Sequence, residues 1–270
     1  MHWNFGATKW SRPAILCLGT ACLLGGFVST SQAEQCHGVP GALGTARVMA
    51  LDPAVFPQVG MVQYPQTVPL RDHEVVLTFD DGPEPSSTPQ LLDALAAQCV
   101  QANFFLVGEH ARAAPELVRR EYAEGHTVGT HSETHADLGK LPLANAEKEI
   151  QDGIAAANAA LGAPNMAAPF FRAPYLSTNP ALEQYLIKAG IMLWSIDVDP
   201  EDWRDFTPQQ MVERTMTQLA LKRSGIILMH DVQGHTAAAM PELLQQLKTH
   251  GYSVVHVVPG SAREAAAHTP

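Results

Sequence analysis

The chain has 270 residues, 46% of them hydrophobic and 16% charged, with a formal net charge of −10 at pH 7. This length and apolar content suffice for one large domain with a closed core, and are too small for two comfortable ones. The acidic balance disfavours nucleic acid and anionic membranes as partners, because neither is attracted without a basic patch and the sequence has none. We expect a monomer.

The first 33 residues have the pattern of a secretory signal peptide. Lys9 and Arg12 precede an uncharged apolar stretch over residues 14–28, and small residues follow up to Ala33. An uncleaved membrane anchor is the competing interpretation, but the apolar stretch is near the lower limit for crossing a bilayer. We therefore predict cleavage after Ala33, export to the periplasm or the medium, and no stable membrane insertion.

Export would leave two cysteines in the mature chain, Cys36 and Cys99, in an oxidising compartment. A disulfide between them would tie the N-terminal part to the domain, and two unpaired thiols are the alternative. Residues 34–70 are interrupted by prolines and glycines, which predicts an irregular arm. We expect the folded domain over residues 71–260 and a C-terminal tail over residues 261–270.

From residue 74 onward, short apolar runs alternate with amphipathic helical patterns. The expected strands cover residues 74–79, 102–107, 127–130, 170–172, 192–196, 225–229 and 253–257, and the expected helices cover 88–98, 115–124, 144–161, 180–189, 208–222 and 237–250. This alternation predicts an α/β fold with a parallel sheet, and about seven strands suit a barrel or near-barrel. In such a fold, polar residues just past the strand ends assemble on one rim.

Two of these strand ends carry the strongest candidates for a site. The first strand ends in adjacent carboxylates, Asp80 and Asp81, and such a pair of like charges is costly without a cation. The third strand is followed by His131 and His135, four residues apart. A turn-forming Asp and solvated histidines are the alternatives for each motif taken alone. Together, two imidazoles and a carboxylate form a three-ligand set that leaves positions open for water, which is typical of a catalytic zinc site.

Five segments resemble, in order and spacing, the motifs of the polysaccharide deacetylases, the family 4 carbohydrate esterases. The segments are Thr-Phe-Asp-Asp-Gly-Pro at 78–83, His-Ser-Glu-Thr-His at 131–135, Arg-Ala-Pro-Tyr at 172–175, Asp-Pro-Glu-Asp-Trp at 199–203 and Leu-Met-His at 228–230. The resemblance covers about residues 70–257. It implies a distorted (β/α) barrel, one divalent metal ion, usually Zn²⁺, and hydrolytic removal of acetyl groups from a polysaccharide or oligosaccharide.

The resemblance also implies roles for the residues of the first three motifs. Asp81, His131 and His135 would be the metal ligands. Asp80 would be the general base, and Arg172 would hold it by a charge-assisted contact. A metal ion in this family activates water and polarises the acetyl carbonyl.

The remaining roles concern the oxyanion and the leaving group. The resemblance implies that Tyr175 offers its backbone N–H to the oxyanion, and that His230 is the general acid, kept protonated by Asp202. Asp199 is the alternative to Asp202 at this place. Two apolar residues would wall the pocket for the acetyl methyl group, with ordinary core packing as the alternative: Trp203 and Leu228.

We therefore expect an exported, metal-dependent hydrolase of carbon–nitrogen (non-peptide) bonds that deacetylates a glycan. N-acetylglucosamine polymers or oligomers, such as chitooligosaccharides, are favoured because a complete acid and base set suits an amine leaving group. The motifs alone do not separate N-acetyl from O-acetyl substrates. The alternatives are a metal-dependent amidohydrolase of a small molecule and a catalytically inactive glycan-binding protein.

Overall fold

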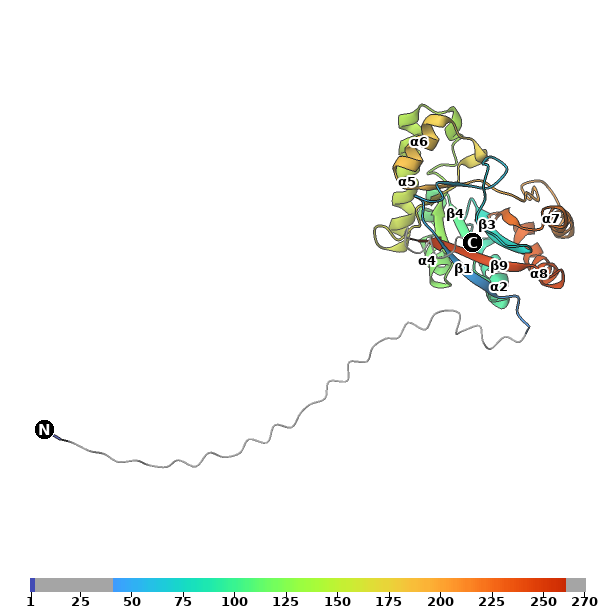
Figure 1. Ribbon diagram of the computed structural model, residues 1–270, viewed down its shortest axis with the longest axis horizontal. Helices are drawn as coiled ribbons and strands as arrows, with labels where there is room; N and C mark the ends of the chain where they lie inside the picture. The colour runs from blue at the N-terminus through green and yellow to red at the C-terminus, as the bar shows by residue number, and fades with distance from the viewer. Residues whose placement is uncertain (3–40, 261–270) are drawn as a thin grey trace.

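A computed structural model describes residues 1–2 and 41–260 of the chain (Figure 1). The predicted signal peptide beyond residue 2, Cys36, and the predicted tail over 261–270 lie outside the described residues, so cleavage and the Cys36–Cys99 pairing stay predictions. Cys99 is disulfide-bonded. Within the described part of the chain, no helix combines the length and the apolar character that crossing a bilayer requires.

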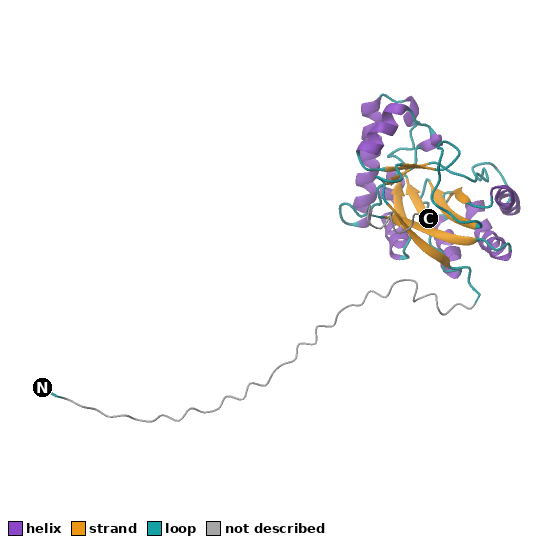
Figure 2. Ribbon diagram, in the orientation of Figure 1, coloured by secondary structure: helices purple, strands orange, loops and turns teal. Residues whose placement is uncertain are grey.

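Helices surround the sheet on its outer side, as Figure 2 shows. They are α2 Thr88–Ala97, α3 Gly108–Ala113, α4 Pro115–Ala123, α5 Leu143–Leu161, α6 Pro180–Lys188, α7 Pro208–Lys222 and α8 Gly234–Thr249. Four of them have a proline at the first or second helical position, where its missing N–H leaves no hydrogen bond unmade. All six predicted helices are confirmed, and α3 was missed because six residues are too few to show a helical period.

Nine strands form one parallel sheet in the described residues. They are β1 Thr45–Leu51, β2 Gln58–Val59, β3 Glu74–Asp80, β4 Asn103–Leu106, β5 Thr127–Thr130, β6 Phe170–Phe171, β7 Met192–Trp194, β8 Gly225–His230 and β9 Ser253–Pro259. The order is β1-β9-β3-β4-β5-β6-β7-β2, and β8 pairs with β3 off this path. All seven predicted strands are therefore present.

The sheet closes on itself. β3 pairs with β4 on one side and with β8 on the other. Val198, beyond the end of β7, forms a parallel bridge with Ile227 of β8. The ring from β3 to β8 is thus a barrel, distorted because the short β2 lies beside β7 where a full strand would complete the ring. The α/β fold and the distorted parallel barrel are confirmed.

β3 is buried along its whole length and sets the direction of the site. Val75, Leu77 and Phe79 belong to the large apolar cluster that the strands share with α2, α7 and α8. Val76 belongs to a second cluster, on the other side of the strand. Because side chains alternate along a strand, Asp80 points to the same side as Val76, away from those helices. The apolar run therefore delivers a carboxylate to the end of the barrel interior.

The predicted irregular arm over residues 34–70 contains two strands in the part that the structure describes. β1 pairs in parallel with β9, beside which it lies in Figure 1, and β2 pairs with β7. β1 is a partly exposed strand between Gly44 and Pro53, so the glycine and proline mark its limits and do not exclude it. β2 has only two residues, too few for any period to appear.

β9 closes the amino end of the barrel. The backbone oxygen of Val257 accepts hydrogen bonds from Asn103 Nδ2 at 2.7 Å and from Thr127 Oγ1 at 2.9 Å, and these are the first residues of β4 and β5. The polar strand ends that carry the motifs lie at the opposite, carboxyl end.

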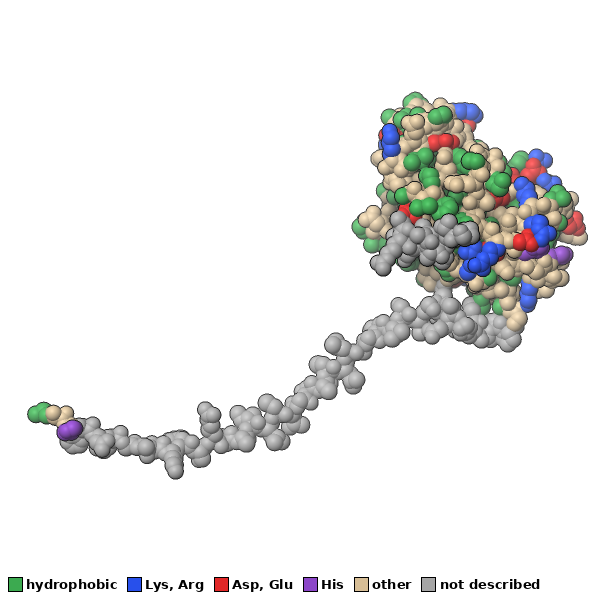
Figure 3. Space-filling model, in the orientation of Figure 1, with side chains coloured by type: hydrophobic (Ala, Val, Ile, Leu, Met, Phe, Trp, Pro, Cys, Tyr) green, Lys and Arg blue, Asp and Glu red, His purple; other side chains and the backbone are tan. Residues whose placement is uncertain are grey.

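On the face drawn in Figure 3, Lys and Arg side chains are interspersed with Asp and Glu.

Candidate active site

Three candidate metal ligands meet at the carboxyl end of the barrel. Asp81 Oδ1 lies 3.4 Å from His131 Nε2 and 3.2 Å from His135 Nε2. One ligand atom from each residue lies within 4.8 Å of the others. Asp81 Oδ1 is buried and has no hydrogen-bond partner among the described residues. A divalent cation would satisfy this oxygen and bind both nitrogens, so the three residues fit a metal site.

The Nδ1 atom of each histidine contacts another residue of the site, so that Nε2 faces the Asp81 carboxylate. His131 Nδ1 donates a hydrogen bond to the backbone oxygen of Arg172 at 2.7 Å, which leaves Nε2 as the free acceptor. His135 Nδ1 lies 3.2 Å from the Tyr175 hydroxyl. Burial lowers the pKa of His131 to about 3, so this imidazole is neutral at pH 7, as a ligand must be.

Strained backbone is concentrated around these ligands. Asp81, Ser132, His135 and Tyr175 have φ angles of 76°, 66°, 58° and 58°, in the left-handed region that residues other than glycine rarely adopt. Such conformations persist only where the surrounding structure fixes them, and they occur most often at functional sites.

Asp80, the candidate base, forms a buried ion pair. Its Oδ1 accepts a hydrogen bond from Arg172 Nη1 at 2.6 Å, and its Oδ2 lies 3.9 Å from His131 Nε2. Arg172 also donates to Thr78 Oγ1 at 2.9 Å and to the Ser195 backbone oxygen at 3.2 Å. Burial raises the pKa of Asp80, and the Arg172 charge opposes that rise. The pair fixes a carboxylate next to the metal ligands in a position to accept a proton.

The candidate acid, His230, is held by Asp202 and not by Asp199. His230 Nδ1 donates to Asp202 Oδ1 at 2.7 Å, and the His230 backbone N–H donates to Asp202 Oδ2 at 2.8 Å. Asp199 Oδ1 instead accepts a hydrogen bond from the Glu201 N–H. Burial lowers the pKa of His230, but the hydrogen bond and charge of Asp202 outweigh it and raise that pKa to about 9. His230 is therefore a protonated imidazole at neutral pH.

The other predicted site residues differ in their surroundings. The side chain of Tyr175 is exposed, and its backbone N–H donates no hydrogen bond to any described residue. Trp203 is 54% exposed, with the Arg204 guanidinium 4.8 Å from the ring centroid. Leu228 is buried on β8. The pocket for the acetyl group thus stays a prediction for both apolar residues.

Three residues without an assigned role also contact the site loops. His110 of α3 is one of them, because its Nδ1 lies 2.6 Å from the Asp81 backbone oxygen. Glu133 accepts a hydrogen bond from Arg112 of α3 at 3.1 Å. Asp231 is fully buried and follows the candidate acid. In the sequence, Glu133 lies inside the motif at 131–135 and Asp231 directly follows the motif at 228–230, whereas His110 lies outside all five motifs.

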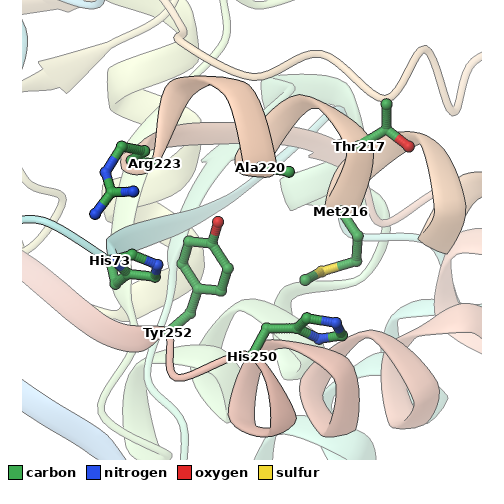
Figure 4. Close-up of a pocket in the computed structure, with 7 residues that line it drawn as sticks. All are labelled: His73, Met216, Thr217, Ala220, Arg223, His250 and Tyr252. Carbon is green, nitrogen blue, oxygen red and sulfur yellow. The ribbon is translucent and has the colours of Figure 1, made fainter.

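A separate hollow of about 420 Å³ lies at the other end of the barrel (Figure 4). Its lining residues are His73, Met216, Thr217, Ala220, Arg223, His250 and Tyr252. Three of these come just before β3, β8 and β9, which places the hollow at the amino end. None of the predicted site residues lines it, so it is distinct from the candidate active site.

Sequence comparisons match this chain to one enzyme family and to individual enzymes of similar sequence. The family described as polysaccharide deacetylase matches residues 67–194. The peptidoglycan-N-acetylmuramic acid deacetylase PdaC of Bacillus subtilis is 36% identical over 193 residues, which cover 71% of this chain and 39% of that protein. The chain thus spans well under two thirds of PdaC. The chitooligosaccharide deacetylase of Sinorhizobium fredii is 31% identical over 209 residues, which cover 72% of this chain and 95% of that protein.

Solved structures agree with these matches. The Bdellovibrio bacteriovorus peptidoglycan deacetylase aligns with a TM-score of 0.71 at 29% identity, over 86% of this chain and 68% of that chain. A family 4 carbohydrate esterase from Streptomyces lividans, solved in complex with acetate, aligns with a TM-score of 0.60 at 34% identity, over 70% and 92% of the two chains. The five motifs, their meeting at one end of the barrel and the extent of these matches place the chain in the polysaccharide deacetylase family.

Proposed function

We propose that the protein is an exported, metal-dependent deacetylase that hydrolyses the N-acetyl groups of N-acetylglucosamine polymers or oligomers. The observation that carries the proposal is the joint presence, at one end of the barrel, of a three-ligand group, a buried carboxylate paired with an arginine, and a histidine paired with a carboxylate. A metal, a base and an acid are together sufficient components for the hydrolysis of an unactivated amide by water. Export rests on the pattern of the first 33 residues.

Asp81, His131 and His135 would hold the metal, and imidazole with carboxylate suits Zn²⁺. When bound, a divalent ion supplies a more acidic water and polarises a carbonyl oxygen. Asp80 accepts the proton of the attacking water, while Arg172 holds the carboxylate in place. The ion pair also explains why a carboxylate remains usable as a base in a buried site.

The remaining steps use Tyr175 and His230. The N–H of Tyr175, which has no partner among the described residues, donates to the oxygen on which negative charge develops, as an oxyanion donor. His230 then gives its proton to the departing nitrogen, because an amide anion is too basic to leave. Asp202 holds the imidazole by Nδ1, so Nε2 is the nitrogen that delivers the proton. This need for an acid favours N-acetyl over O-acetyl substrates.

The names of the relatives support an amino-sugar substrate. Similar proteins are described as peptidoglycan and chitooligosaccharide deacetylases, and both substrates contain N-acetylated glucosamine units. Every motif position carries a residue capable of its chemistry, which disfavours an inactive glycan-binding protein. We therefore place N-acetylglucosamine glycans ahead of small-molecule amides.

The test is acetate release by the purified mature protein from chitooligosaccharides, peptidoglycan and acetylated xylan, before and after chelation and Zn²⁺ addition. We expect metal-dependent release from an N-acetylglucosamine glycan, reduced by about 10² or more in Asp80→Asn. Asp72→Asn, an exposed carboxylate before β3, is the matched control and should keep full activity. Bound metal without release from any of these glycans would contradict the proposal.

A further inference from the structure

The peptide unit that joins Asp81 to Gly82 is held from two sides by residues outside the five motifs. Asp81 combines a candidate metal-binding carboxylate with a φ of 76°. A strained backbone of this kind reverts unless neighbouring groups fix it. The direction of its carboxylate depends on the orientation of the following peptide unit, so whatever fixes that unit also sets the metal site.

His110 holds the oxygen of this peptide unit. Its Nδ1 lies 2.6 Å from the Asp81 backbone oxygen, and a carbonyl only accepts, so Nδ1 carries the hydrogen. The start of α3, which carries His110, is itself attached to both metal-binding loops. The N–H of Val107 donates to the backbone oxygen of Gly82 at 3.2 Å, and the N–H of Gly108 donates to the backbone oxygen of Ser132 at 3.0 Å.

The Asp231 carboxylate contacts the Gly82 part of this peptide unit. A Cβ added to Gly82 would lie 2.0 Å from Asp231 Oδ2 and 2.2 Å from Oδ1, so the carboxylate packs directly against the glycine backbone. Asp231 is itself fixed, because its Oδ2 accepts from Thr88 Oγ1 at 2.5 Å and its backbone oxygen accepts from Ser87 Oγ at 2.5 Å. Its Oδ1 meets no donor at hydrogen-bonding geometry among the described residues, but the Gly82 N–H is close enough to oppose the rise in the Asp231 pKa that burial causes.

Asp231 also connects this turn to the candidate acid. Its backbone N–H donates to the backbone oxygen of Asp80 at 3.3 Å, and Asp231 directly follows His230 in the chain. Neither His110 nor Asp231 belongs to the three-ligand group. Their contacts are with the backbone that carries a ligand, which is the position of groups that orient metal ligands in other proteins.

From these contacts we propose that His110 and Asp231 are positioning residues that fix the Asp81–Gly82 peptide unit in its metal-binding orientation. The inference rests on the proposed function in one respect, the role of Asp81 as a metal ligand. It goes beyond that function because it proposes that His110 and Asp231, which bind neither metal nor substrate, increase the metal affinity of this chain.

The experiment is Zn²⁺ titration of the metal-free full chain against a chromophoric chelator, without glycan. We expect His110→Ala to weaken Zn²⁺ binding by about 10- to 100-fold, the range for lost outer-shell partners. His110→Asn places an amide donor where Nδ1 stood and should restore most of the affinity. The matched control is His250→Ala, since His250 Nδ1 also lies 2.9 Å from a carbonyl oxygen, that of Gln246, but at the other end of the barrel.

Asp231→Ala removes the backing of Gly82 and should also weaken Zn²⁺ binding by about tenfold or more. Circular dichroism of each metal-free variant shows whether it has folded, and the His110→Asn variant keeps the test decisive if one alanine variant has not. Wild-type affinity in folded His110→Ala and Asp231→Ala would overturn the inference.

The same titration separates this inference from the proposed function. A wild-type protein that binds Zn²⁺, loses affinity in the variants and releases no acetate would support the positioning role and contradict the deacetylase. Unchanged affinity in the variants with normal acetate release would do the reverse. A wild-type protein that binds no Zn²⁺ would contradict both.

Discussion

Two buried histidines at opposite ends of the barrel, His256 and His230, are left in opposite charge states. At the amino end, His256 lies 2.8 Å from the Thr127 hydroxyl, and burial lowers its pKa to about 4. At the carboxyl end, burial acts on His230 in the same direction, but Asp202 reverses the effect and the pKa rises to about 9. The presence of one carboxylate, that of Asp202, thus makes His230 a proton donor, whereas His256 is a neutral packing residue.

The ends also differ in how their polar groups are satisfied. At the amino end, Asn103 and Thr127 donate to one backbone oxygen of β9 and carry no charge. At the carboxyl end, Asp81 has a strained backbone and a buried oxygen with no hydrogen-bond partner in the described part of the chain. These buried polar groups at the amino end are neutral and bonded to one another, whereas the carboxyl end retains unfavourable groups that a metal and a substrate can use.

The sharpest test of the comparison removes one histidine from each end. His230→Gln removes the proton donor, and general acid catalysis is typically worth about 10²–10⁴ in rate, so kcat for acetate release should fall by that factor. His256→Gln keeps a group that can bond Thr127 and should leave kcat close to the wild-type value. Equal losses in two folded variants would show that the carboxyl-end histidine has no special role.

A smaller effect is expected when the histidine stays and its carboxylate is neutralised. In Asp202→Asn, burial still lowers the pKa of His230, and the hydrogen bond and charge that oppose it most are gone, so this pKa should fall from its wild-type value of about 9. The wild type should keep its acid up to pH about 9 and lose activity above it, whereas the variant should lose activity at a lower pH. We expect a decrease of about 10- to 100-fold at pH 7.5.

The measurement is the pH profile of kcat/KM for acetate release. Asp199→Asn is the matched control, because Asp199 follows the same strand but makes no hydrogen bond to His230. An alkaline limb that moves in Asp199→Asn and stays in Asp202→Asn would reverse our assignment of the partner.

The sequence was most informative where one strand carries both packing and chemistry. β3 could be predicted with both carboxylates, because an apolar run broken by Asp-Asp-Gly-Pro has few other interpretations. The pairing of His230 with Asp202 could not be chosen over Asp199, because both follow β7 within a few residues and the path of the loop decides. The contact of His110 could not be predicted, since its partner is a backbone oxygen that no residue pattern reveals.

The smallest expected effect concerns a buried carboxylate with no cation. Asp80 is paired with Arg172, whereas neither oxygen of the fully buried Glu121 on α4 has a hydrogen-bond partner among the described residues. Burial raises the pKa of Glu121 well above its ordinary 4.5. The folded state therefore keeps a proton that the unfolded state releases above that value, and the free energy of unfolding falls as pH rises.

Glu121→Leu removes this penalty while keeping an apolar side chain of similar size. At pH 8 we expect its free energy of unfolding in urea to exceed that of the wild type by about 1–3 kcal/mol, the usual cost of an unsatisfied buried polar group. At pH 4 the carboxyl is protonated in both states, so the difference should narrow. Glu116→Gln, at an exposed position of the same helix, should show no such widening with pH. A wild type that gains stability as pH rises, relative to Glu121→Leu, would mean that Glu121 is ionised in the folded protein, and the contrast with Asp80 would then fail.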